Sequence, residues 1–203
     1  MRLNETANII SPKRSPIFLQ AVYRNILCYV FQHNNIPNDS NPLHWDPDVK
    51  KTDILIELDD NDNIEVRQKR PAIIISSSGM TINDQIAIGQ GRERISLTEG
   101  VNQRHAFAQT NITLHIDSCQ KEESKALAYI VAAIVCTAHQ AIRGEFNIHH
   151  IDPVYISQTS EINIGEGYYR TSITFNIITD FTWFTSKLDF PVEKIVGVVV
   201  KQE

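Results

Sequence analysis

The sequence predicts an α+β protein with a mostly antiparallel β-sheet that is flanked by helices. Two segments have the apolar spacing of helices, one near the start of the chain and one after Ser118. Alternating or β-branched runs lie between and after them, as is typical of strands. The order helix, strands, helix, strands favours an α+β arrangement, with a long β-hairpin and a β extension near the end of the sequence.

The first helix is predicted over about residues 16–32. Ser15 is a good N-cap, and Pro16 suits the first helical position, where its missing N–H costs nothing. The following residues 34–50 are rich in Asn, Asp and Pro and predict an ordered or semi-ordered loop. Two apolar side chains within this loop indicate that it packs on another part of the protein: Leu43 and Trp45.

Several strands are predicted between the helices. The alternating DILIEL at 53–58 predicts a strand, and residues 64–66 are its expected hairpin return. PAIIIS at 71–76 is a β-branched run. Residues 81–100 predict two strands around a Gly-rich turn at 89–91. Further β-rich segments are expected at 107–116, 148–156, 168–183 and 194–201.

The second helix carries the strongest signal. Asp117 or Ser118 is the expected cap, and Glu122 and Glu123 suit the positive end of the helix dipole. Arg143-Gly144 is the expected end. An apolar stripe is predicted to pack this helix on the sheet: Leu127, Ile130, Val131, Ile134, Val135 and Ala138.

Length and composition indicate an ordinary globular protein. The 203 residues are 42% hydrophobic and 21% charged, which fits one α+β domain over residues 1–203. The first helix, the loop 34–50 and an extension at about 182–203 are its expected appendages. No run approaches 18 apolar residues and the start lacks a signal-like core, so synthesis and folding in a cytoplasm are expected.

Charge and cysteine content exclude some function classes. A net charge of −5 argues against a surface that coats nucleic acid, although a local basic patch stays open. The three cysteines are far apart and have no ligand-like spacing. Neither a disulfide framework nor a zinc site is indicated.

Cys119 is the candidate nucleophile, because a helix N-terminus lowers the pKa of a thiol. A nucleophile also needs a positioned base, and His115 on the preceding strand is the nearest candidate. No Gly-rich elbow or family signature surrounds Cys119. An ordinary residue at a strand-to-helix junction is the favoured interpretation, and no catalytic residue is predicted.

Two segments resemble metal sites in part. Asp59, Asn61 and Asn63 have the spacing of the first EF-hand ligands, but Ile64 stands where Gly is required and Arg70 where Glu is required. This favours an acidic hairpin turn.

His149 and His150, with Asp152, form the second segment. Neighbouring residues on a strand point to opposite faces, so the two histidines are not expected to chelate one ion. Neither a metal nor another cofactor is predicted.

Arg92, Arg94 and Arg104 flank the predicted hairpin around residue 89. GQGRER lacks the spacing and the Lys-Ser/Thr of a phosphate loop. A solvated loop is one interpretation. The other is a basic patch that faces a polyanion or a neighbouring subunit.

The order of elements resembles the tail terminator (tail completion or neck) proteins of long-tailed bacteriophages. The resemblance spans roughly residues 16–181. The segments that carry it are PIFLQAVYRNILCYV, PAIIIS, NITLHIDSCQKEESKALAYIVAAIV, VYISQTSEI and YYRTSITFNIITDF.

The resemblance implies a non-enzymatic virion protein, assembled in the host cytoplasm, that forms a six-fold ring on the head-proximal end of the tail tube. Implied partners are other copies of the chain, the tube protein, a sheath protein in a contractile tail, and the head connector. DNA would pass through the lumen without sequence recognition. The hairpin carrying Arg92, Arg94 and Arg104 is the implied ring or lumen contact.

Rival interpretations stay open. Another connector component, such as an adaptor or stopper, or a sheath or tube protein, would share these elements. A small cytoplasmic hydrolase using Cys119 or the His149–His150 pair, or a host binding module, belongs to a different class. The apolar, β-branched run IVGVVV at 195–200 is hazardous at an exposed edge, so either the sheet core or a neighbour is expected to cover it.

Overall fold

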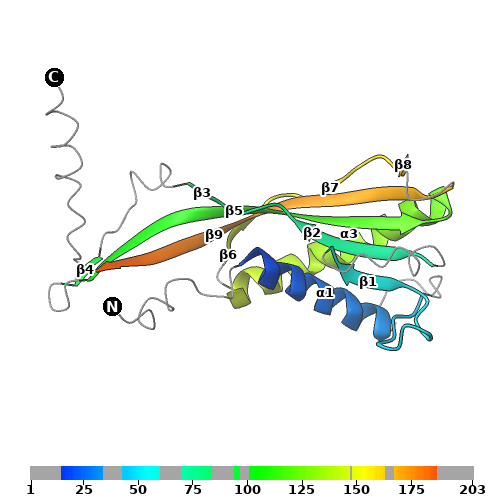
Figure 1. Cartoon of the computed structure of the whole chain (residues 1–203), viewed down its shortest axis with the longest axis horizontal. Helices are drawn as coiled ribbons and strands as arrows, with labels where there is room; N and C mark the ends of the chain where they lie inside the picture. Colours follow the sequence, from blue (N-terminus) through cyan, green and yellow to red (C-terminus); the bar gives the residue numbers. More distant parts are fainter. Residues whose placement is uncertain are drawn as a thin grey trace, which may run out of the picture.

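The computed structural model describes residues 15–33, 43–59, 70–83, 94–96, 101–146, 148–162 and 167–186. Of residues 94–96, 101–106 and 180–186 it describes the backbone alone. Two helices lie on one side of a long, twisted sheet (Figure 1). The α+β class predicted from the sequence is confirmed.

Within the described residues, nine strands form one sheet with the central order β1-β2-β5-β9-β6. Their bounds are Leu55–Leu58 (β1), Ala72–Ser77 (β2), Thr81–Asn83 (β3), Arg94–Ser96 (β4), Val101–Ser118 (β5), Ile148–Ile151 (β6), Tyr155–Ile156 (β7), Ser160–Glu161 (β8) and Tyr169–Ser186 (β9). β1 and β2 are parallel, and every other pairing is antiparallel.

The first helix, α1 (Pro16–Gln32), has the predicted bounds. The Phe18 N–H donates to the Ser15 side chain at 3.2 Å, so Ser15 is the N-cap. The part of the loop 34–50 that the structure describes, residues 43–50, is a chain of turns. Leu43 and Trp45 pack against the core, as expected.

The second helix, α3 (Lys121–Phe146), starts later and ends later than predicted. Neither Asp117 nor Ser118 is its N-cap, because both still belong to β5. The Asp117 carboxylate binds Arg170, and the Ser118 hydroxyl accepts the N–H of Gln120 and donates to Glu123. The helix continues through Gly144 for two residues, because that glycine does not adopt the left-handed conformation that ends many helices.

The hairpin predicted within residues 81–100 is wrong in its pairing. β3 and β4 each pair with β5 and not with each other. The long antiparallel pair is instead β5 with β9, eighteen residues each, and α3 with β6–β8 connects them. Two predicted strands, residues 64–66 and 194–201, lie outside the described residues, as does the turn at 89–91.

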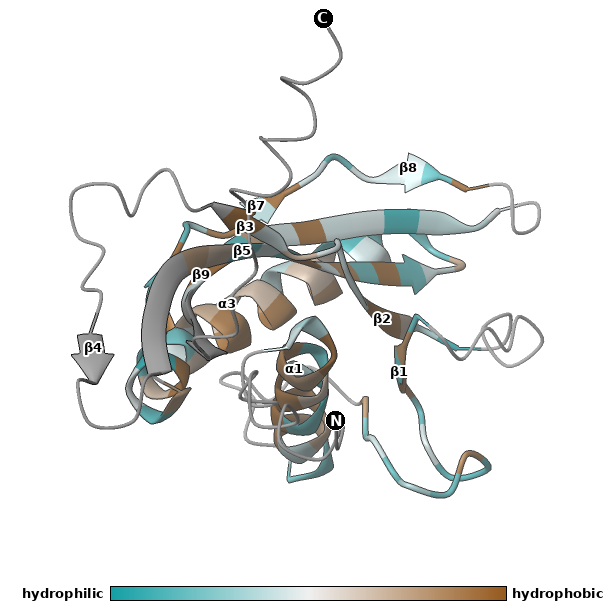
Figure 2. Cartoon of the chain, turned by 60° about the vertical axis from the view of Figure 1, so that its left-hand side comes forward, coloured by the Kyte–Doolittle hydropathy of each residue, from teal (hydrophilic) through white to brown (hydrophobic). Residues whose placement is uncertain are grey.

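The core lies between the sheet and the helices. β5 and β9 turn alternate side chains toward α1 and α3, which matches the alternation in the sequence and the alternating colours of Figure 2. The stripe of α3 joins this core: Leu127, Val131, Ile134 and Val135 are buried, and Ile130 and Ala138 are partly buried. α3 has the length and apolar content of a membrane-spanning helix, but this stripe faces the sheet.

His139 of α3 lies within this core. Its ring is 5.0 Å from that of Phe175 and 6.1 Å from that of Tyr23, between centroids. Its Nε2 atom is buried without a hydrogen-bond partner in the described part of the chain. This burial lowers the pKa of His139 from its ordinary 6.5.

The burial of His139 predicts that the free energy of unfolding decreases at acid pH. The unfolded chain binds the proton more readily than the folded one, so stability is complete above pH 6.5 and falls as the pH drops below that value. Thermal melts of the wild type and of His139→Gln between pH 5 and 8 measure the effect. The variant should show the flatter profile, whereas the exposed-site control His33→Gln should follow the wild type. Equal slopes in wild type and His139→Gln would contradict the assignment.

Candidate functional site

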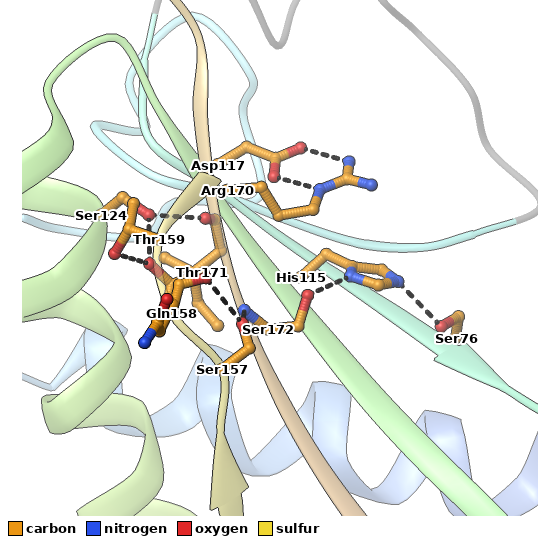
Figure 3. A network of polar contacts seen from close by, with 11 residues as sticks. Ser76, His115, Asp117, Ser124, Ser157, Gln158, Thr159, Arg170, Thr171 and Ser172 are labelled. Atoms are coloured by element: carbon orange, nitrogen blue, oxygen red, sulfur yellow. Dashed lines mark hydrogen bonds and ion pairs between the residues drawn. The ribbon is translucent and has the colours of Figure 1, made fainter. Parts of the chain in front are cut away.

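A stripe of polar side chains crosses the sheet on the face opposite the helices (Figure 3). It joins β2, β5 and β9 through pairs that the strand register sets opposite each other. The pairs are Asp117 with Arg170, His115 with Ser172, and Thr113 with Thr174. The sequence offers no sign of this stripe, because its partners are more than fifty residues apart.

The Asp117–Arg170 ion pair is the most buried part of the stripe. The Arg170 guanidinium donates from Nε to Oδ1 and from Nη2 to Oδ2, both at 2.7 Å. The Asp117 side chain is 4% exposed and that of Arg170 25% exposed. Bidentate geometry and burial make this a strong cross-strand contact, and both carboxylate oxygens are engaged.

His115 lies between two serines. Its Nδ1 is 2.9 Å from the Ser172 hydroxyl, and its Nε2 is 3.4 Å from that of Ser76. These two contacts join β5 to β2 on one side and to β9 on the other. The Asp117 carboxylate, two residues along the same strand, binds Arg170.

A second polar chain lies where α3 meets β9. The Ser124 hydroxyl donates to the backbone oxygen of Ile116 at 2.9 Å and lies 2.9 Å from the Thr171 hydroxyl. That hydroxyl is in turn 2.8 Å from Thr159 (Figure 3). These bonds fix α3 and the segment that contains β7 and β8 to the same end of β9.

Cys119 is exposed and lies in the turn between β5 and α3. Its Sγ donates to the Tyr168 hydroxyl at 3.1 Å. Desolvation, with smaller contributions from the hydrogen bond and the charge of Cys119, raises the pKa of Tyr168 to about 12. The histidine that a thiol nucleophile would need, His115, is bonded to serines.

Cys119→Ser is expected to leave folding and assembly nearly unchanged. The side chain is exposed, so the free energy of unfolding should change by no more than about 0.5 kcal/mol. Denaturant titration and light scattering of the purified variant measure the two properties. Loss of assembly in a variant that still folds would give Cys119 a role that its contacts do not show.

The two histidines at 149 and 150 contact different partners. A β-bulge in β6 separates them, with Ile148 and His150 in register and His149 between. The His149 ring lies 4.8 Å from that of Phe107, whereas His150 Nε2 is 3.0 Å from an Asp152 carboxylate oxygen. No group of three His, Cys, Asp or Glu side chains within the described ranges is arranged to hold a metal ion.

Two of the three predicted arginine contacts, Arg94 and Arg104, lie on an arm of the sheet. Beyond the helices, residues 101–106 of β5 pair with 181–186 of β9, and β4 adds at the tip (Figure 1). Arg94 is in register with Gln103, and Arg104 with Trp183. The fold thus brings these two positions onto neighbouring strands, and Arg92 lies outside the described residues.

A groove of about 520 Å³ lies between the first turns of α3 and the β7–β8 segment. Lys121, Lys125 and Tyr129 line it from the helix, and Tyr155 and Gln158 from the sheet edge. Tyr129 and Tyr155 are 57% and 67% exposed. Neither lysine makes an ion pair within the part of the chain that the structure describes. No local sequence pattern indicates this groove. Its helix side and its sheet side come together only because β7 pairs with β9.

No protein-family model and no curated protein sequence matches this chain.

Proposed function

We propose that this chain is a structural virion subunit that closes into a ring, six-fold by the resemblance, at the head-proximal end of a phage tail tube. There it ends tube growth and joins the tail to the head connector. The tube protein, a sheath protein in a contractile tail and the connector are its partners. DNA passes through the lumen without sequence recognition.

The observation that carries this proposal is the arm. Residues 101–106 and 181–186 form a ribbon about 20 Å long that stands beyond the helices. No helix of the described residues covers this ribbon, and a narrow ribbon by itself is marginally stable in water. A contact with another copy would cover and stabilise it. A head-to-tail contact of this kind closes into a ring when the rotation between copies permits it.

The candidate chemistry supports a structural role. Along the polar stripe, the hydrogen-bonding groups of Asp117, His115 and Ser172 join strands to each other. Such cross-strand bonds hold β2, β5 and β9 together in the part of the sheet that carries Thr113 to Asp117.

A backbone-directed variant tests the role of the arm. Gln103 pairs with Arg94 on one side and Phe184 on the other, so Gln103→Pro removes an N–H from a strand that has neighbours on both sides. The expected result is loss of ring assembly with the core intact, measured by light scattering and thermal unfolding. Gln103→Ala is the matched control and should still assemble. Normal rings from Gln103→Pro would contradict a role of the arm in closure.

A further inference from the structure

The groove between α3 and the β7–β8 segment has the architecture of a site for an added strand. β6, β7 and β8 pair with β9 on one side, and no strand of the described chain pairs with them on the other. A helix covers the approach to this edge, so an extended segment placed there would have backbone partners on one side and side chains on the other. β-strand addition uses this combination.

The backbone of the edge is oriented for such an addition. The Ser157 N–H donates inward to the Ser172 oxygen at 2.8 Å. Polar backbone groups alternate in direction along a strand, so those of Ile156 in β7 point away from β9, and Ile156 lines the groove. This position offers backbone hydrogen bonds to an incoming strand.

The chain contains a segment that fits this edge. After β9 come residues 187–203, which include the β-branched run IVGVVV at 195–200. Its length is close to that of the edge from Tyr155 to Glu161. The exposed rings of Tyr129 and Tyr155 would cover part of its apolar surface.

Distance decides which copy supplies the segment. The near end of the edge, Tyr155, is in register with Thr174, which lies about 40 Å from Ser186 at roughly 3.4 Å per residue of β9. A fully extended chain from Ser186 reaches at most about 32 Å by Ile195. Ile195 therefore cannot reach Tyr155 in its own chain, so the whole run cannot lie along that edge.

We infer that residues 195–200 of one copy add as a strand to the β7–β8 edge of the neighbouring copy, in the groove beneath α3. This inference rests on the proposed ring, and it specifies one of its contacts. The arm, with Ser186 at the end of β9, lies at one end of the described sheet, and α3 with β8 beside the groove lies toward the other (Figure 1). A contact between opposite ends is head-to-tail, as a ring requires.

Cross-linking between two differently tagged full-length copies tests the inference. Both carry Cys119→Ser and Cys136→Ser, which remove the exposed thiols and leave the buried Cys28. One copy carries Gln158→Cys and the other Val198→Cys, and the two are co-expressed and oxidised. We expect a disulfide-linked pair that contains both tags. The control places the first cysteine at Asn25, an exposed position on α1, and should give a several-fold lower yield.

The outcomes separate this inference from the proposed function. If closed rings form and the yield of the doubly tagged disulfide pair does not exceed that of the control, the strand addition is wrong and the proposed ring is still supported. A chain that forms no ring and no pair overturns both. Ile156→Pro supplies a second readout, because it removes an outward N–H while Ser157 keeps its inward bond. It should prevent closure of a folded monomer, whereas Ile156→Ala should not, and equal assembly of the two would count against the inference.

Discussion

Phe175→Ala is expected to lower the free energy of unfolding by about 3–5 kcal/mol. Phe175 is 2% exposed and lies in the centre of the core on β9. Its ring centroid is 5.0 Å from those of both Tyr23 on α1 and His139 on α3, so it contacts both helices at once. Truncation removes the transfer free energy of the ring and leaves a cavity that two helices and a sheet cannot readily close.

Urea titration at a protein concentration low enough to keep the chain monomeric measures this loss, because assembly would add its own stabilisation. Phe175→Leu is the matched control. It preserves most of the apolar volume and should cost about 1.5 kcal/mol or less. A Phe175→Ala cost no larger than that of Phe175→Leu would mean that the aromatic contacts between the helices and β9 are not those described.

Asp117→Ala is expected to cost about 3–5 kcal/mol, because it leaves the Arg170 guanidinium without the carboxylate that pairs with it. The penalty comes mainly from the loss of the carboxylate charge and of its two hydrogen bonds beside a guanidinium that is only 25% exposed. Removing the exposed partner in the Lys51–Asp48 pair, by Lys51→Ala, should cost at most about 1 kcal/mol. Chemical denaturation of both variants provides the comparison.

A double variant separates the two causes of the Asp117 effect. Asp117→Leu with Arg170→Met removes both charges and fills similar volume, so it should be markedly more stable than Asp117→Ala alone. If the double variant is as unstable as the single one, packing rather than the unpaired charge explains the loss. If Asp117→Ala costs less than about 1 kcal/mol, the pair does not hold β5 to β9 as its geometry indicates.

The parts of the fold that the sequence predicts are those governed by local rules. Ser15 and Pro16 mark the start of α1, and the alternation at Ile112, Leu114 and Ile116 marks a strand with one buried face. These signals lie within a few residues of each other. The stripe of α3 was predicted for the same reason.

The parts that could not be predicted depend on pairing between distant segments. From its place before a helix, Asp117 is predicted to be a helix cap. In the structure the strand register places Arg170, 53 residues later, opposite Asp117, and the two side chains form an ion pair. β3 and β4 are predicted to form a hairpin because they follow each other in the sequence. In the structure both strands pair with β5. Hydrophobic pattern constrains which face of a strand is buried, and it does not choose between partners that bury the same face.

The candidate sites, too, could be predicted only where their residues are close together in the sequence. Cys119 is exposed in the turn before α3, and His149 and His150 contact different partners. The arm combines residues 101–106 with 181–186, and the groove combines α3 with β7 and β8. Both surfaces form only when β5 and β9 have paired. No short stretch of sequence predicts that pairing.

The mass of the purified chain in solution, by light scattering with negative-stain images of the same sample, decides whether the subunit closes into a ring. We expect a closed ring with a central hole and a mass six times the 23.1 kDa of one chain. The arm variant Gln103→Pro should give the mass of one chain in the same buffer. A wild-type chain that stays monomeric at every concentration measured, with no rings in the images, would contradict ring closure.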